Sequence, residues 1–391
     1  MAMKWIFYLH PLKKNMMTHN QHSILFLATE YESGMRPYAC TIIHNMWNER
    51  SHAIVVIKDE KYKQDFADLD PERVHFIHYP TCKLGKLVFR FFPNKLIQKI
   101  NQLIATFNLD IVYSLTGELV MRNSIKRLQE NIPLLYTSHD AIPHETKQPL
   151  LSLIKEWVFI TRPQRNILKK VSHIVTNSRS QHHYISHHYP HSHVHYAPFP
   201  SLINPDIARG GKTVPEIADI YDYILFFGNI HLYKGVDLLY HCYHLHPEIH
   251  RHPLVLAGAG HYYFSRYATE KNVRIINRFV ADNEVSNLFQ KAAVVVYPYI
   301  SATQSGVISI ASYFNKPIIL SDVDYFKEVA RGYSGVTFFK KGDIHDLAKA
   351  LSVALSKSQP TTDLYNKEYS SEAMVGAISS IIQELINNKY E

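Results

Sequence analysis

Glycines followed by a single lysine mark a candidate phosphate site in the second half of this 391-residue chain. The stretch FFGNIHLYKG (residues 226–235) leaves an apolar run at Gly228 and ends in Lys234 and Gly235, directly before an amphipathic pattern. The free N–H groups and the positive dipole end of a helix attract anions, and a lysine adds a point charge. The pattern suits a diphosphate, and a solvated loop lysine is the alternative interpretation.

Two later stretches add possible ligand contacts. LVLAGAG (residues 254–260) is a strand pattern ending in Gly258 and Gly260, which permit either a close backbone approach to a ligand or a tight turn. A further strand pattern ends at Pro298 and is followed by a polar loop, with a helix expected from about Gln304. Amide and hydroxyl donors from residues 304–306 would then lie at a helix start.

Short β-rich runs alternate with helical patterns along the whole chain, which predicts parallel sheets with crossover helices in both halves. The apolar runs predict strands at residues 24–28, 53–58, 74–79, 110–114, 133–138, 173–178, 223–228, 253–258, 273–276, 293–298, 317–320 and 335–339. The proline-rich segment 197–216 has no clear period and is the expected linker. We therefore expect domains at 1–205 and 206–370, both doubly wound, and a C-terminal helix at 371–391 that could cross back to the first domain.

The order of these pieces resembles the donor-binding domain of family-four retaining glycosyltransferases with the GT-B fold. The match includes INRFVADNEVSNLFQKAAVVVYPY (residues 276–299), the loop after it, and a closing PIILSDVDYFKE that ends at Glu328. It covers residues 222–356 closely and the first half loosely. The resemblance implies two Rossmann-like domains that face a cleft, with the acceptor bound by the first and the nucleotide sugar by the second.

The resemblance also implies roles for individual residues. Lys234 would contact the donor diphosphate, Arg278 would lie near the nucleotide or phosphate, and His139, just after a first-half strand, would touch the donor sugar. These three are the expected catalytic residues. The expected donor-binding residues are Gly34, Gly228, Asn229, Gly235, Gly258, Gly260, Thr303, Gln304, Ser305, Gly306, Val307 and Glu328.

The chain departs from the family pattern at three positions. Asn229 stands where the family usually has an arginine, and the family's paired glutamates align with Thr303 and Ala311. These departures put the usual contacts to the donor in doubt, although they leave the fold unaffected.

The resulting prediction is a glycosyltransferase that moves a sugar to a glycan or lipid-linked acceptor with retention and without a metal ion, in surface polysaccharide synthesis. A nucleotide-sugar epimerase or hydrolase on the same fold is one alternative, and a non-catalytic GT-B module is another. The donor base, the sugar, the acceptor and the oligomeric state are left open.

Positive charge is concentrated in the first half, where residues 1–200 hold 24 Lys and Arg against 15 Asp and Glu. The segment Lys83–Phe107 combines lysines with an apolar face and contains no acidic residue. A basic amphipathic segment suits an anionic membrane surface, and a core-facing helix with a solvated basic flank is the alternative. No nucleic-acid module is legible, so nucleic acid is not an expected partner.

Location and metal binding are constrained only weakly. Three widely spaced cysteines suit a reducing cytoplasm, and no signal peptide or membrane span is expected, so we predict a cytoplasmic protein that could lie on the inner face of the plasma membrane. Seven histidines in residues 180–198 and the Asp322–Asp324 pair could bind metal, but a surface patch and a GT-B loop are the favoured interpretations.

Overall fold

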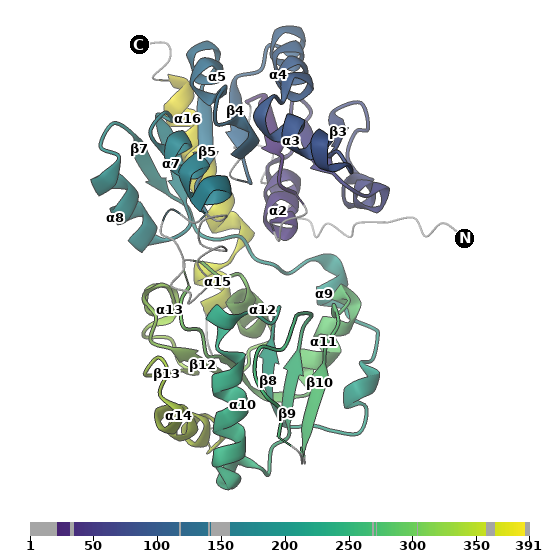
Figure 1. The fold of residues 1–391 in the computed structure, drawn as a ribbon, viewed down its shortest axis with the longest axis vertical. Helices are drawn as coiled ribbons and strands as arrows, with labels where there is room; N and C mark the ends of the chain where they lie inside the picture. The colour runs from purple at the N-terminus through teal and green to yellow at the C-terminus, as the bar shows by residue number, and fades with distance from the viewer. Residues whose placement is uncertain are drawn as a thin grey trace. The chain divides into compact units, whose positions relative to one another are not determined.

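The two groups of predicted strands form two separate parallel sheets in the computed structural model of this chain. The structure describes residues 22–387, except 32–34, 117–118, 140, 142–156, 268–269, 271, 303 and 357–363. Among the described residues, those up to Pro200 and those from Ser371 onward form the first compact unit, and those from Ser201 to Ser370 form the second (Figure 1).

The first unit has a seven-stranded sheet in the order β3-β2-β1-β4-β5-β6-β7. Its strands are β1 (Ile24–Ala28), β2 (His52–Ile57), β3 (Val74–His78), β4 (Ile111–Ser114), β5 (Leu134–Thr137), β6 (His173–Thr176) and β7 (His193–Tyr196). Its helices are α2 (Arg36–Met46), η1 (Glu60–Phe66), α3 (Lys83–Phe91), α4 (Asn94–Phe107), η2 (Leu119–Met121), α5 (Ile125–Asn131), η3 (Trp157–Thr161), α7 (Arg162–Leu168), α8 (Arg179–His188) and α16 (Ser371–Asn387).

The central strand β1 is fully buried because both faces of this sheet are covered. Leu25 and Leu27 face a core that includes Leu96 and Ile100 of α4, while Phe26 packs on the opposite side near Trp47. A strand buried on both faces needs a continuous apolar run rather than an alternating pattern. The run ILFLA meets that need, which is why the sequence alone predicts this strand.

The second unit has a six-stranded parallel sheet in the order β10-β9-β8-β11-β12-β13. Its strands are β8 (Tyr223–Phe227), β9 (Leu254–Ala257), β10 (Val273–Ile276), β11 (Ala292–Tyr297), β12 (Ile318–Ser321) and β13 (Val336–Phe339). Its helices are α9 (Pro205–Arg209), η4 (Pro215–Ile217), η5 (Leu232–Lys234), α10 (Val236–Leu245), η6 (Pro247–Ile249), α11 (Asp282–Gln290), α12 (Val307–Tyr313), α13 (Asp324–Ala330), α14 (Ile344–Ser356) and α15 (Leu364–Glu368). Both sheets confirm the prediction of a doubly wound parallel sheet in each half of the chain.

Strand β7 is the strand that the sequence analysis did not predict. Its residues HVHY are polar at alternate positions, so no apolar run marks it. It pairs with β6, where His173 lies in register with His193 and the two rings stack at 5.0 Å. The alternating histidines therefore form part of the sheet edge.

Two pairs of histidines on neighbouring strands should make the first unit acid-sensitive. Burial, reinforced by nearby positive groups, lowers the pKa of His173 and of His75 to about 4, and it also lowers the pKa values of their partners His195 and His52. Histidines that stay neutral in the folded state stabilise it above the unfolded pKa, and that stability is lost as the pH falls from about 6.5 toward 4.

When the pH is lowered from 7 to 5, we expect the free energy of unfolding of the first unit to decrease by about 1 kcal/mol per histidine after solvent screening. The thermal midpoint of this unit should therefore fall over the same pH range. The double variant His75→Gln/His173→Gln should show a shallower decline in the same melting series. An identical pH dependence in wild type and variant would contradict this account.

Candidate functional site

The candidate site of the second unit lies at the carboxyl ends of β8, β9 and β11. Since the strands are parallel, these ends share one edge of the sheet, where ligands bind in doubly wound folds. The loops there are joined by backbone hydrogen bonds: Gly228 N–H donates to the Ala257 carbonyl at 2.9 Å, and Ile300 N–H donates to the Tyr233 carbonyl at 2.7 Å. The edge is therefore a connected set of loops.

Lys234 lies within these loops and is only 8% exposed. Its ammonium is 5.4 Å from the centre of the Tyr299 ring and 5.9 Å from that of Tyr233. Within the residues that the structure describes, its side chain has no hydrogen bond or ion pair. Burial therefore lowers the pKa of Lys234, which Tyr233 offsets in part. A buried ammonium that has no carboxylate partner is energetically unfavourable, and a bound anion would stabilise it.

Glycines create the space for this lysine. A Cβ on Gly228 would lie 3.0 Å from the Lys234 Nζ atom. Gly235 has φ 62° and would place a Cβ 2.1 Å from the Pro298 carbonyl oxygen, and Gly258 has φ 151° and would place one 2.0 Å from the Gly228 carbonyl oxygen. These glycines are needed for contacts between loop backbones, and Gly260, with φ 157°, similarly packs on Ile230.

Replacing Gly258 with alanine should destabilise the second unit by about 3 kcal/mol or more, because strain at positive φ adds to a backbone clash. Gly342→Ala is the matched control, since Gly342 also has positive φ, at 80°, but a Cβ there would meet nothing within 4 Å. Thermal unfolding of the two variants measures the difference. Equal destabilisation would show that the close approach to Gly228 is unimportant.

Arg278 has partners that the sequence analysis did not foresee. Its guanidinium donates to Glu216 at 2.8 and 3.0 Å, to Glu284 at 2.8 and 3.1 Å, and to the Phe279 carbonyl at 3.3 Å. These bonds use all five N–H donors of an arginine. Its hydrogen bonds hold the pKa values of Glu216 and Glu284 below their usual range. Arg278 could reach a phosphate only by giving up a carboxylate.

The loop before α12 is placed differently from the prediction in one respect. The helix begins at Val307 rather than near Gln304, so Gln304 and Ser305 belong to the preceding loop and Gly306 is the N-cap. The hydroxyl of Tyr297 donates to the Val307 carbonyl at 3.0 Å, which ties the helix start to β11.

The other predicted donor-binding residues lie at different places. Glu328 lies half-buried in α13, and Thr303 lies outside the described residues. Asn229 is exposed directly after Gly228.

His139 follows β5 in the first unit and is buried. Its Nε2 atom lies 2.6 Å from the Leu115 carbonyl oxygen, so Nε2 carries a hydrogen and donates a hydrogen bond to this carbonyl. Its ring meets Tyr38 edge-on at 4.7 Å, and its own carbonyl accepts a hydrogen bond from Gln181. The ring is held rigidly at a strand end, while Gly34 lies outside the described residues.

The segment Lys83–Phe107 divides into two helices with opposite behaviour. Leu96, Ile100 and Leu103 of α4 are buried in the core, so this half follows the core-facing alternative. Apart from the buried Phe89, the large apolar side chains of α3 are instead exposed, with Leu84 71% and Phe92, just after the helix, 67% accessible. Among the described residues, no helix is long and apolar enough to cross a membrane.

The metal alternatives receive no structural support within the described part of the chain. No group of three or more His, Cys, Asp or Glu side chains there could hold a metal ion. Asp322 accepts a hydrogen bond from the Lys341 N–H, and Asp324 pairs with Lys327 at 3.0 Å. Metal-independent catalysis stays a prediction.

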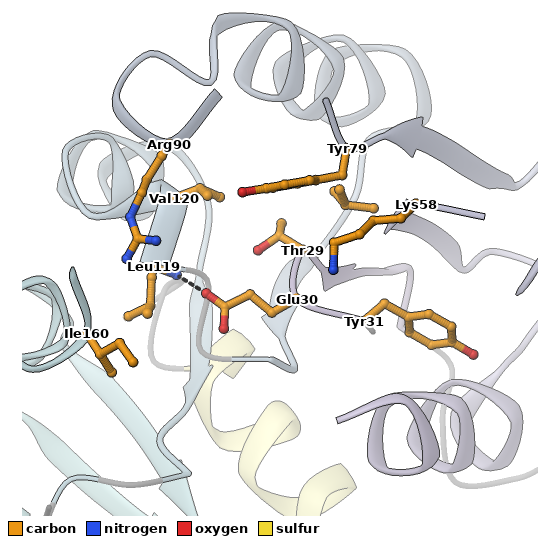
Figure 2. Close-up of a pocket in the computed structure, with 10 residues that line it drawn as sticks. Thr29, Glu30, Tyr31, Lys58, Tyr79, Arg90, Leu119, Val120 and Ile160 are labelled. Carbon is orange, nitrogen blue, oxygen red and sulfur yellow. Dashed lines mark hydrogen bonds between the residues drawn. The ribbon is translucent and has the colours of Figure 1, made fainter. Parts of the chain in front are cut away.

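The first unit contains a cavity of about 310 Å³ that the sequence analysis missed (Figure 2). Residues that follow β1, β2, β3 and β4 line it, together with Arg90 of α3 and Ile160 of η3. The order of strands in this sheet reverses between β1 and β4, so the cavity lies at the topological switch point. Thr29 and Glu30 directly follow the predicted strand 24–28, and Lys58 and Tyr79 are the last residues of the predicted strands 53–58 and 74–79. This position at strand ends could have identified them.

Two family models match the sequence, and they divide it close to the structural boundary. Residues 33–200 match the model described as Glycosyltransferase Family 4, and residues 221–357 match Glycosyl transferases group 1. No curated protein matches the chain significantly.

Solved structures share the fold at low sequence identity. HepE from Anabaena in complex with UDP has a TM-score of 0.63 at 17% identity, covering 94% of this chain and 100% of that one. Sucrose-phosphate synthase from Thermosynechococcus elongatus has a TM-score of 0.65 at 13% identity, with coverage of 94% and 100%. UDP-GlcNAc 2-epimerase from Neisseria meningitidis, bound to UDP-GlcNAc, has a TM-score of 0.55 at 12% identity with the same coverage. The chain thus carries a glycosyltransferase family 4 domain followed by a glycosyl transferases group 1 domain, in a GT-B fold.

Proposed function

We propose that this protein transfers a sugar, with retention and without a metal ion, from a nucleotide-sugar donor to a glycan or lipid-linked acceptor in surface polysaccharide synthesis. One observation carries the donor side of the proposal. Lys234 is a buried cation without a carboxylate partner among the described residues. It lies in the loops at the carboxyl ends of the strands, where doubly wound sheets bind ligands. A nucleotide diphosphate supplies the anion that this lysine lacks.

The chemistry follows from where charge develops. Breaking the bond between sugar and phosphate increases negative charge on the leaving diphosphate. A cation already desolvated and held in place stabilises that charge without reorganising, which is the usual source of electrostatic catalysis. The aromatic rings of Tyr233 and Tyr299 lie near the ammonium and limit its competing contacts with water.

No metal is assigned to the diphosphate in this proposal, because the donor's charge would be met by Lys234 and by backbone N–H groups of the connected loops. Gln304, Ser305, Gly306 and Val307 follow β11 at the same edge and are the proposed contacts to the sugar and phosphate. His139 is proposed to approach the donor sugar from the first unit.

The experiment incubates the purified chain with a panel of nucleotide sugars and a glycan acceptor, with and without EDTA. HepE of Anabaena was crystallised with UDP, so uridine nucleotides are the first members of the panel. We expect an acceptor-dependent product that keeps the donor's anomeric configuration by NMR and is insensitive to EDTA. Equal turnover without acceptor would favour the epimerase or hydrolase alternative, and nucleotide binding without turnover would favour the non-catalytic module.

A peripheral location on the inner face of the plasma membrane belongs to the same proposal. It is supported by α3, where Lys83, Lys86 and most of the apolar side chains are exposed, and not by α4, whose apolar face is buried. If this surface binds a membrane, the acceptor is expected to be the lipid-linked one.

A further inference from the structure

An exposed apolar surface is built from two segments that are about seventy residues apart in sequence. We call it the α3–η3 surface; it comprises Leu84, Leu87, Val88, Phe91, Phe92, Trp157, Val158, Phe159 and Ile160, each 39% to 71% exposed. A contiguous exposed apolar patch of this kind on a folded protein is typical of a surface that binds another protein or a membrane. The η3 half of this surface was not predicted from the sequence.

Arg90 joins the two halves of the α3–η3 surface, and Arg122 supports the α3 half. Arg90 donates a hydrogen bond to the Phe159 carbonyl and lies 5.0 Å from the centre of that ring. Arg122 donates to the Arg90 carbonyl at 3.1 Å and covers the Phe91 ring at 4.6 Å. The two segments therefore form one continuous surface in the first unit.

The two segments that form the surface contain basic residues and no acidic residue of their own. Both halves come from stretches without any Asp or Glu, residues 73–109 and 157–205. Within the described residues, Arg90 and Arg122 have no carboxylate partner, and Arg122 is only 8% exposed. Exposed Lys83, Lys86 and Arg162 lie on the same segments. Apolar side chains with a basic rim are complementary to an anionic lipid surface.

The cavity at the β1–β4 switch point adjoins this surface. Ile160 belongs both to the α3–η3 surface and to the cavity wall, and Arg90, which joins the two halves of the surface, also lines the cavity. Figure 2 shows them on one side of the cavity, Lys58 and Tyr79 on the other, and Glu30 between. The Glu30 carboxylate accepts a hydrogen bond from the Leu119 N–H at 3.3 Å, and the Lys58 ammonium lies 5.6 Å from the centre of the Tyr79 ring.

The cavity thus offers two cations on opposite sides and one carboxylate that is anchored to the backbone. A phosphate group can be met by an arginine and a lysine at once, while a carboxylate can accept from a hydroxyl. A molecule that is apolar at one end and carries phosphate and hydroxyl groups at the other would match the surface and the cavity together.

We propose that the α3–η3 surface docks on an anionic lipid bilayer and that the cavity receives the phosphate-bearing head of a lipid-linked acceptor presented from that bilayer. This inference rests on the proposed glycosyltransferase function, since it names the class of acceptor. The acceptor's apolar chain stays in the bilayer, its phosphate lies between Arg90 and Lys58, and a hydroxyl of its head group approaches Glu30.

Vesicle flotation of the full chain tests the docking step without any nucleotide. Vesicles of phosphatidylcholine are compared with vesicles that also contain phosphatidylglycerol. We expect binding to the anionic vesicles that weakens with salt, and at least about tenfold weaker binding of Leu84→Ser/Phe92→Ser. The matched control is Tyr221→Ser/Leu245→Ser, which removes side chains of similar exposure, 63% and 57%, from the second unit and should bind as wild type does.

A third vesicle composition tests the cavity. Phosphatidylglycerol is replaced by an isoprenyl phosphate at equal charge, and inorganic phosphate and isoprenol are added separately as competitors. We expect tighter binding to the isoprenyl phosphate than to phosphatidylglycerol. Lys58→Gln should remove this preference, about fivefold, while leaving binding to phosphatidylglycerol unchanged. Lys58 suits this test because its side chain is exposed and lies outside the α3–η3 surface.

The outcomes separate this inference from the proposed function. Nucleotide binding with equal flotation of wild type and Leu84→Ser/Phe92→Ser would overturn the docking surface and leave the donor site standing. Vesicle binding without any preference for isoprenyl phosphate, or competition by inorganic phosphate alone, would overturn the acceptor assignment. A concentration-dependent dimer in sedimentation, lost in the same surface variant, would show that the surface binds a second copy and would also overturn the proposal.

Discussion

The variant Lys234→Met is expected to lower kcat/KM for sugar transfer by about 10²–10³-fold, the usual cost of removing one preorganised charge-stabilising group. Methionine keeps the length and the apolar contacts of the lysine stem, so the change removes mainly the charge. Steady-state kinetics with the identified donor measures the loss. Since the charge on the diphosphate grows as the bond breaks, we expect kcat to fall as well as donor affinity.

The folded stability of this variant separates a binding role from a structural one. Burial already disfavours the charged form of Lys234, so its removal should leave the thermal midpoint of the ligand-free protein unchanged or higher. The control is Lys327→Met, because Lys327 forms an exposed pair with Asp324 and should affect neither activity nor stability noticeably. A destabilised Lys234→Met protein with normal kinetics would contradict the assignment.

The same lysine predicts a pH dependence of donor binding. In the ligand-free protein, burial lowers the pKa of Lys234 below the usual value for a lysine. A bound anion favours the charged form and raises this pKa again. Binding is therefore strongest where Lys234 is protonated, and it should weaken as the pH rises through the lowered pKa. Titrations with the nucleoside diphosphate across the alkaline range measure this effect, and Lys234→Met should abolish it.

Replacing Arg278 with alanine is expected to destabilise the second unit by about 3 kcal/mol, because the Glu284 carboxylate would stay buried without its main partner. Glu284 is only 2% exposed, and Lys212 at 3.8 Å can replace only part of the lost interaction. For a domain of this size the thermal midpoint should fall by about 6–12 °C. Differential scanning calorimetry of the two unfolding transitions would assign the change to one unit.

Two variants make this test specific. Arg278→Ala/Glu284→Gln should lose less than the sum of the single changes, since the unpaired charge is gone. Arg274→Ala breaks a much more exposed pair with Asp219 and should cost less than about 1 kcal/mol. An Arg278→Ala protein of normal stability that no longer binds nucleotide would instead restore the sequence prediction that Arg278 serves the donor.

The sheets were predictable because buried parallel strands need continuous apolar runs. The runs at β1, β8 and β11 are legible, and the glycines after β8 and β9 mark where those strands end. Strand β7 lacks this signal since its edge position tolerates alternating histidines. The approach of Lys234 to Gly228 was also predictable, because the two residues are only six positions apart in the sequence.

Contacts that depend on distant pairing were not predictable from this sequence. The partner Glu216 of Arg278 is sixty-two positions away, so the motif around Arg278 gives no hint that its donors are occupied. The helices α3 and α4 have similar compositions, and only packing distinguishes the exposed one from the buried one. The cavity combines residues that follow four strands, and it becomes visible only when the strand order is known.

Isothermal titration of the wild-type chain with nucleoside diphosphates, in buffer containing EDTA, tests the central claim most directly. The account predicts that one diphosphate binds with a single site, that the corresponding monophosphate binds more weakly, and that Lys234→Met abolishes the difference between them. Heat signals that are absent for every nucleotide, or equal affinities of wild type and Lys234→Met, would contradict the claim that the loops around Lys234 hold a donor diphosphate.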